Sequence, residues 1–149
     1  MTGSFTIDAY VKVLSLAPTA QLGGQILFRG DDRGGLDPYY LSVNSDGNIR
    51  FHIEDATGVA VNVEAPITVA AFVHVTASLD ASSGAMRLYL DGVLVAQSTT
   101  AIRPFHDLDA TTHPGIGIGN AQSQPVSSYH YPFHGLIDEL KVYNSVVTP

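Results

Sequence analysis

Aspartate supplies most of the acidic side chains, since eleven of the fourteen acidic residues are Asp. Several of them fall in stretches of turn-forming residues: Asp31, Asp32, Asp37, Asp107 and Asp109. Calcium takes about six to eight oxygen ligands, and loops of this kind can offer carboxylate and backbone carbonyl oxygens together. Aspartate also favours turns because its side chain hydrogen-bonds to the nearby backbone. The pattern therefore leaves two interpretations open, a calcium site and ordinary turn chemistry.

Aromatic residues gather in a second loop, where residues 129–132 read Tyr-His-Tyr-Pro. Exposed rings of this kind can stack on a sugar face or on another protein, with the histidine adding hydrogen bonds. The alternative is that they pack down onto the edge of the fold as a lid. Two further tyrosines follow the acidic loop at 29–38. The candidate ligand-binding residues are Tyr39, Tyr129, His130 and Tyr131.

No catalytic constellation stands out. The chain has no Cys, which excludes thiol catalysis and Cys-ligated zinc. The adjacent acids Asp138 and Glu139 would point to opposite faces of a regular strand, whereas a retaining glycosidase needs two carboxyl groups about 5–5.5 Å apart. No Gly-x-Ser-x-Gly segment offers a serine nucleophile. We therefore expect a protein without enzymatic activity.

Length and charge narrow the function classes further. The 149 residues suit one domain, and 45% hydrophobic with 14% charged residues is too apolar for a disordered chain. Seven basic against fourteen acidic residues give a net charge of −7, so no basic stripe is available for nucleic acid. No apolar run is long enough to insert in a membrane. Residues 1–4 have neither the charged nor the apolar part of a signal peptide, so we expect none in the given chain.

Apolar residues recur at every second position through most of the chain. The period predicts strands over 5–13, 41–53 as a hairpin, 73–79, 86–95 as a hairpin around Asp91-Gly92, 116–118 and 133–143. The phase of the last strand changes at Asp138-Glu139, which predicts a β-bulge that keeps both halves facing the core. The longest loops are expected at 14–25, 29–38, 101–114 and 120–132. We expect an all-β protein, an antiparallel sandwich or barrel of roughly ten to twelve strands.

Six segments in order resemble a laminin-G-like domain of the concanavalin A-like superfamily, in the version common in large bacterial surface proteins. They are SFTIDAYVK (4–12), YLSVNSDG (40–47), VHVTASLD (73–80), RLYLDGVLVA (87–96), GIGN (117–120) and FHGLIDELKVYN (133–144). The resemblance implies an antiparallel jelly-roll β-sandwich of two packed sheets, with residues 1–149 as a single domain. Two positions where the family usually has Trp hold Tyr10 and Phe72, which keep a large aromatic ring. The family usually has a further strand before the first segment, so we expect one edge strand to be missing.

The resemblance also implies a place for calcium. In laminin-G relatives a calcium ion at the rim is held by an acid just before the strand that corresponds to 39–43, which matches Asp37. A second ligand comes from the loop before the Gly-Ile-Gly-like strand, where Asp107 and Asp109 lie. A different calcium site in related sandwiches uses the position of Asp138, whose role here is otherwise hydrogen bonding at the bulge. The metal-ligating candidates are therefore Asp37, Asp107, Asp109 and Asp138.

Two functions from different classes fit these observations. The first is a non-catalytic recognition or adhesion module that binds a glycan or a surface protein with help from calcium. The second is a structural or assembly protein, such as a decoration or fibre domain of a virion or a surface array. In the second case, the sheet is completed by a partner chain or a second copy through strand addition. Both imply an extracellular, surface-exposed or virion location.

Overall fold

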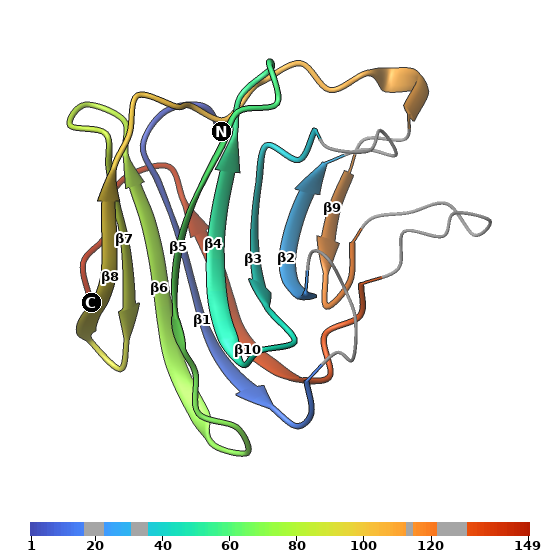
Figure 1. Cartoon of the computed structure of the whole chain (residues 1–149), viewed down its shortest axis with the longest axis vertical. Coiled ribbons are helices and arrows are strands. Elements are labelled where there is room, and N and C mark those ends of the chain that lie inside the picture. The colour runs from blue at the N-terminus through green and yellow to red at the C-terminus, as the bar shows by residue number, and fades with distance from the viewer. Residues whose placement is uncertain (17–22, 31–35, 113–114, 122–130) are drawn as a thin grey trace.

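A computed structural model describes residues 1–16, 23–30, 36–112, 115–121 and 131–149, and these residues form ten strands and a single turn of 3₁₀ helix. The strands are β1 (Phe5–Val13), β2 (Gly24–Gly30), β3 (Tyr39–Val43), β4 (Asn48–Glu54), β5 (Ala60–Pro66), β6 (Phe72–Asp80), β7 (Ala85–Leu90), β8 (Val93–Thr99), β9 (Gly115–Ile118) and β10 (Gly135–Tyr143). The 3₁₀ turn η1 spans Ala110–Thr112 (Figure 1). Within the described part of the chain, no helix is long and apolar enough to cross a bilayer.

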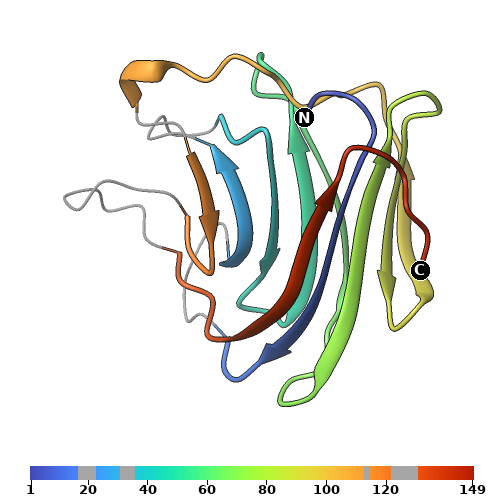
Figure 2. The same ribbon diagram turned by 180° about the vertical axis from the view of Figure 1, so that it is seen from behind.

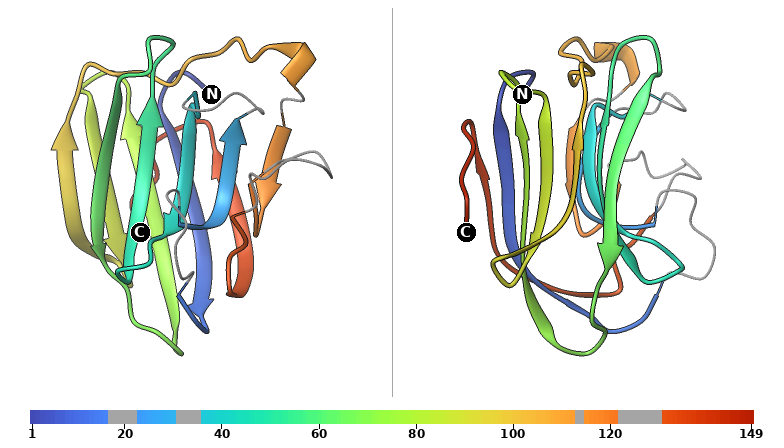
Figure 3. Two further views of the ribbon diagram at one scale, coloured as in Figure 1. Left: turned by 45° about the vertical axis from the view of Figure 1, so that its right-hand side comes forward. Right: turned by 60° about the vertical axis from the view of Figure 1, so that its left-hand side comes forward.

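The strands form two antiparallel sheets that lie face to face. Sheet A has the order β10-β1-β6-β7-β8, and sheet B has the order β5-β4-β3-β2-β9. The reverse view and the two side views show the sheets as separate curved layers (Figures 2 and 3). The expected all-β jelly-roll sandwich is confirmed, and strands distant in sequence, such as β1 and β6, are neighbours in the sheet.

Alternating residues of both sheets fill the space between the layers. β1 contributes every second residue, and its inward side chains have almost no contact with solvent: Phe5, Ile7, Ala9, Val11 and Val13. The facing sheet contributes residues such as Leu41, Ile49 and Phe51. Full burial of a Val, Leu, Ile or Phe side chain among them stabilises the fold by about 1.5–3 kcal/mol. This core fixes which residues of each strand remain on the outer faces.

The predicted turn between β7 and β8 is confirmed. Asp91 and Gly92 both have positive φ, at 50° and 79°, as a two-residue turn of type I′ requires. The Asp91 side chain also accepts a hydrogen bond from the His74 backbone N–H at 2.9 Å, and this ties the turn to β6. The hairpin between β3 and β4 turns at Gly47, whose φ is 83°.

The bulge in the last strand is present, with one difference from the expectation. The register of β1 and β10 shifts between Asp8 and Tyr10, and Glu139 has a φ of 49°. Ile137 and Leu140 on either side both pack against the core, as predicted. Val142 lies opposite the buried Ile7 and therefore faces between the sheets, yet 42% of it is exposed. The bulge restores the phase, but the inward side chain of Val142, near the end of the strand, is only partly covered.

The C-terminal residues turn back onto the first strand. The Thr6 hydroxyl donates to the Ser145 carbonyl at 2.8 Å and accepts from the Val147 backbone N–H at 2.9 Å. Thr6 is fully buried as a result, although it lies on the outer side of sheet A. Thr6 and Tyr143 are opposite each other in the ladder, so this contact closes one end of the β1–β10 pair.

Candidate functional site

All four predicted metal ligands, three at the rim and one at a separate site, lie in the described part of the chain. Asp37 is buried, close to Gly30 and Tyr40. Asp107 is exposed and pairs with His106, while Asp109 accepts hydrogen bonds from Thr111. Asp138 accepts from the Glu139 backbone N–H at 2.8 Å, which is the bulge role considered for it. Among the residues that the structure describes, no group of three or more His, Asp or Glu side chains could hold a metal ion, and calcium stays a prediction.

The predicted ligand-binding residues also lie in different surroundings. Tyr39 is buried in the core, with its ring centroid 4.9 Å from that of Phe5, so it offers no ring face to a ligand in this structure. Tyr131 is partly buried against Tyr40 and neighbouring apolar residues, its N–H donates to Asn120 Oδ1, and its carbonyl accepts from the Gln25 N–H. This placement fits the lid interpretation for that tyrosine. Tyr129 and His130 lie outside the described residues.

Sheet B carries a buried polar cluster on its outer side. Tyr40 of β3 and His52 of β4 are directly opposite in the ladder and stack at 4.2 Å with an angle of 9° between the rings. His52 Nδ1 lies 2.7 Å from Asn62 Oδ1, and Nε2 lies 3.3 Å from the Glu54 carboxylate. Tyr40 is only 2% exposed. Burial raises the pKa of its hydroxyl, and a hydrogen bond with Arg50 partly opposes that effect.

The neighbouring ion pair extends this cluster along the sheet. Arg50 Nε donates to Glu64 Oε1 at 2.5 Å across β4 and β5. Partial burial lowers the pKa of Arg50, but the hydrogen bonds to Glu64 and Tyr40 outweigh it and raise the pKa overall. Two polar atoms nearby, Ser42 Oγ and Glu54 Oε1, are buried without a hydrogen-bond partner in the described structure. The cluster is polar but largely closed to solvent.

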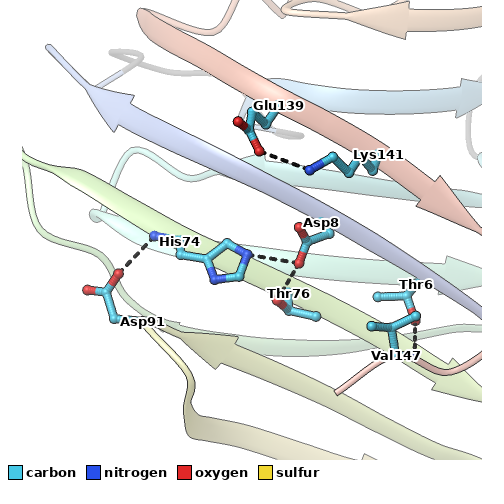
Figure 4. A network of polar contacts seen from close by, with 8 residues as sticks. All are labelled: Thr6, Asp8, His74, Thr76, Asp91, Glu139, Lys141 and Val147. Carbon is cyan, nitrogen blue, oxygen red and sulfur yellow. Dashed lines mark hydrogen bonds and ion pairs between the residues drawn. The ribbon is translucent and has the colours of Figure 1, made fainter. Parts of the chain in front are cut away.

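Sheet A carries a second tyrosine–histidine pair, and this one is open. Tyr10 of β1 and His74 of β6 are also directly opposite in the ladder, and they stack at 4.6 Å with an angle of 16°. The Asp8 carboxylate lies 2.9 Å from His74 Nε2 and accepts a hydrogen bond from Thr76 Oγ1 at 2.7 Å (Figure 4). Tyr10 is 42% exposed. The result is an accessible ring on a fixed support.

Polar and apolar groups surround this exposed ring. On β10, Asp138 is the residue opposite Tyr10, and both are exposed. Two residues further along β1, the Lys12 ammonium lies 6.0 Å from the centre of the exposed Phe72 ring. The surface therefore combines two accessible aromatic rings with carboxylate, ammonium and imidazole groups. Such a mixture can contact the apolar faces of a polyhydroxylated ligand and hydrogen-bond its hydroxyl groups.

Sequence reasoning missed this open surface. Alternation already places Asp8, Tyr10 and Lys12 on the polar side of the first strand. His74 and Thr76 alternate in the same way within another predicted strand. The missing information was the register that sets Tyr10 opposite His74, because long-range pairing cannot be read from the period of a single strand.

Comparison with known proteins places this architecture. Two five-stranded antiparallel sheets packed face to face define a jelly-roll β-sandwich of the lectin type. The chain belongs to the concanavalin A-like lectin/glucanases superfamily, since a laminin-G family model of that description matches residues 1–149. No curated protein sequence matches the chain.

Several solved structures share the fold. The carbohydrate-binding module CBM40 of a Ruminococcus gnavus sialidase, bound to α2,3-sialyllactose, is 18% identical with a TM-score of 0.72; the match covers 99% of this chain and 79% of that one. Domain 4 of an extracellular arabinanase from Geobacillus stearothermophilus, in complex with arabinotriose, is 22% identical with a TM-score of 0.65, over 99% and 64%. A candidate carbohydrate-binding protein from Bacteroides ovatus is 21% identical with a TM-score of 0.66, over 99% and 39%. At these identities the likeness concerns the fold.

Proposed function

We propose that the chain is a non-catalytic glycan-binding module, and that it binds sugar on the outer face of sheet A around Tyr10. The observation that carries the proposal is the exposed Tyr10 ring stacked against His74, whose Nε2 lies 2.9 Å from the Asp8 carboxylate. Tyrosine gives a large, rigid contact area at a small cost in conformational entropy. Here the ring is held further by stacking, so less freedom is lost when a ligand binds.

The hydrogen bonds on this face favour binding over catalysis. Asp8 accepts from Thr76 and pairs with His74, Asp138 accepts from a backbone amide, and Glu139 is paired with Lys141 at 2.9 Å. A glycosidase needs one carboxyl group to protonate the leaving oxygen and a second to act as nucleophile or base. The carboxylates on the described part of this face are instead engaged by neighbouring groups that hold the surface in shape.

The fold relatives support a sugar as the ligand. Two of the solved structures with this fold are complexes with sialyllactose and with arabinotriose. A surface-exposed or extracellular location follows from the proposal, because glycans of this kind are met outside the cell. Calcium assistance through Asp37 remains part of the proposal.

A glycan array followed by calorimetry with the strongest hit tests the proposal. We expect Tyr10→Ala to weaken binding by about tenfold or more, in line with a lost ring contact of about 1.4 kcal/mol. Leu94→Ala is the matched control, because Leu94 is also 42% exposed and belongs to sheet A. The proposal fails if no glycan binds, or if the two substitutions weaken binding equally.

A further inference from the structure

In the part of the chain that the structure describes, the sandwich is open at one end, where the two sheets finish with β9 and β10. In sheet B, Ile118 of β9 lies opposite Leu27, which belongs to the core, so Ile118 faces between the sheets. Even so, it is 63% exposed, and Ile116, two residues earlier on the same side, is 61% exposed. In sheet A, Val142 of β10 is the exposed inward residue noted above. Three large apolar side chains thus face between the sheets and are only partly covered by the described chain.

The opposite end shows what a closed end looks like in this molecule. There β5 contacts β7 and β8 across the sandwich, and the inward residues Val61 and Ala96 pack against the core. By contrast, sheet A ends at β10 and sheet B ends at the four-residue β9 (Figures 1 and 3). Neither β9 nor β10 has a second strand partner among the described strands. Free backbone groups and uncovered apolar side chains therefore occur together.

We propose that a β-strand of another polypeptide adds to the free edge of β10 and covers Ile116 and Ile118 with its inward side chains. β10 has nine residues against four in β9, so it is the longer edge even though its bulge at Glu139 interrupts the row of backbone groups. An added strand there would widen sheet A by one strand at the open end. Its main-chain hydrogen bonds supply affinity, and its alternate side chains fill the open end. Ile116 and Ile118 are two residues apart, which matches the period of a strand.

Charge favours a basic or neutral strand over a second copy of this chain. Glu139 is the middle residue of β10, so a symmetric antiparallel pair of two copies would place the two Glu139 carboxylates opposite each other. Like charges opposite each other in a ladder are destabilising. Each copy also has a net charge of −7, which opposes association. A strand with Val at the inward positions would cover the exposed apolar side chains. Lys at some outward positions would complement the negative charge of the chain.

A peptide with capped ends and the sequence KVTVKVTVK tests the proposal with the whole chain, because it matches β10 in length. We expect saturable binding by fluorescence polarisation and slower hydrogen exchange of the β10 amides in the complex. Ile118→Asp should weaken binding roughly tenfold, through loss of an apolar contact. Val93→Asp is the matched control, because Val93 is 62% exposed on the opposite edge strand. Ile116→Asp repeats the test if Ile118→Asp does not fold.

Four outcomes overturn the proposal. The first is no binding of the peptide up to about 1 mM, which corresponds to only about 4 kcal/mol of affinity. The second is equal weakening by the Ile118 and Val93 substitutions. The third is a dimer of the chain alone by light scattering with its β10 amides protected, which would make a second copy the occupant. Equal binding of EVTVEVTVE would remove the charge preference and with it the argument for this occupant.

Discussion

The outer faces of the two sheets carry the same pair of residues in different surroundings. Tyr40 and His52 stack on sheet B, Tyr10 and His74 stack on sheet A, and each pair joins directly opposite positions of neighbouring strands. Each histidine also has a carboxylate partner, Glu54 in one case and Asp8 in the other. The pairs differ in access, because Tyr40 is buried and Tyr10 is exposed.

Because the two Tyr–His pairs differ in solvent access, we expect them to have different roles. A buried pair adds apolar contact and hydrogen bonds to the folded state, so its loss is felt as stability. An exposed pair with its own hydrogen-bonded support adds little burial but presents a ready-made surface, so its loss is felt as binding. Residue types and spacing do not distinguish a buried pair from an exposed one. The distinction depends on whether other residues of the chain pack over the pair.

The largest expected effect is on the buried pair. Tyr40→Ala should lower the free energy of unfolding by about 3–5 kcal/mol, the range for removing a buried aromatic ring. Tyr10→Ala should cost less than about 1 kcal/mol, since much of that ring is already in water. Urea denaturation of both variants measures the difference. Equal losses would contradict the contrast between the two faces.

Calcium gives the next largest effect, if the predicted rim site next to Tyr40 exists. A ligand that binds only the folded state adds about 2.7 kcal/mol at a hundredfold excess over Kd, which raises Tm by a few degrees in a domain of this size. We expect this rise on adding calcium and its loss in Asp37→Asn. Identical melting curves in chelator and in excess calcium would rule out the site, as would a variant that keeps the full shift.

His74, which stacks against the exposed Tyr10 ring, should matter more for glycan binding than for the stability of the fold. His74→Ala removes the stacking partner of Tyr10 and the contact with Asp8, which is worth about 1 kcal/mol as a net hydrogen bond. We expect a stability loss of that size and a several-fold weaker affinity for whichever glycan the array identifies. His74→Phe keeps the stacking and should recover most of the affinity. An affinity unchanged in His74→Ala would show that the support is dispensable.

The smallest effect is the pH response of the buried pair. Burial raises the pKa of Tyr40 above its ordinary value near 10, so the folded chain holds that proton when the unfolded chain has lost it. This contribution to stability is complete below about pH 10 and is lost as the pH rises through the folded-state pKa. Absorbance titration at alkaline pH, with Tyr40→Phe subtracted, isolates this group. A difference curve centred at the ordinary tyrosine value would contradict the burial.

The sequence predicts the fold well where one strand pattern is self-contained. The alternation of β1, the Asp91-Gly92 turn and the phase change at Glu139 all appear in the structure as expected. β2 and β5 were not anticipated. In β5 the alternation of Val61, Val63 and Ala65 was a usable signal, whereas β2 begins and ends with Gly and has no clear period, which is typical of a strand with both faces covered.

The candidate site was less predictable because it depends on register and cover. Tyr39 and Tyr40 are adjacent in sequence, and their side chains point to opposite faces of β3, but both turn out to be buried. The cover over Tyr40 includes Ala121 and Tyr131, which are some eighty or more positions away in the chain. Residue type alone does not distinguish the exposed Tyr10 from the buried Tyr40. Only the pairing of β1 with β6 shows that the Tyr10 ring stacks against His74.

The hold of Thr6 on Ser145 and Val147 has a mechanical consequence. Because Thr6 and Tyr143 are opposite each other in an antiparallel pair, the N-terminal end of β1 and the C-terminal end of β10 lie side by side. A force that pulls these ends apart would load one backbone pair at a time and peel β10 away, rather than shear the whole ladder at once. The two hydrogen bonds of Thr6 lie at the end where that force would act first, so we expect this hydroxyl to resist the first step of opening under tension.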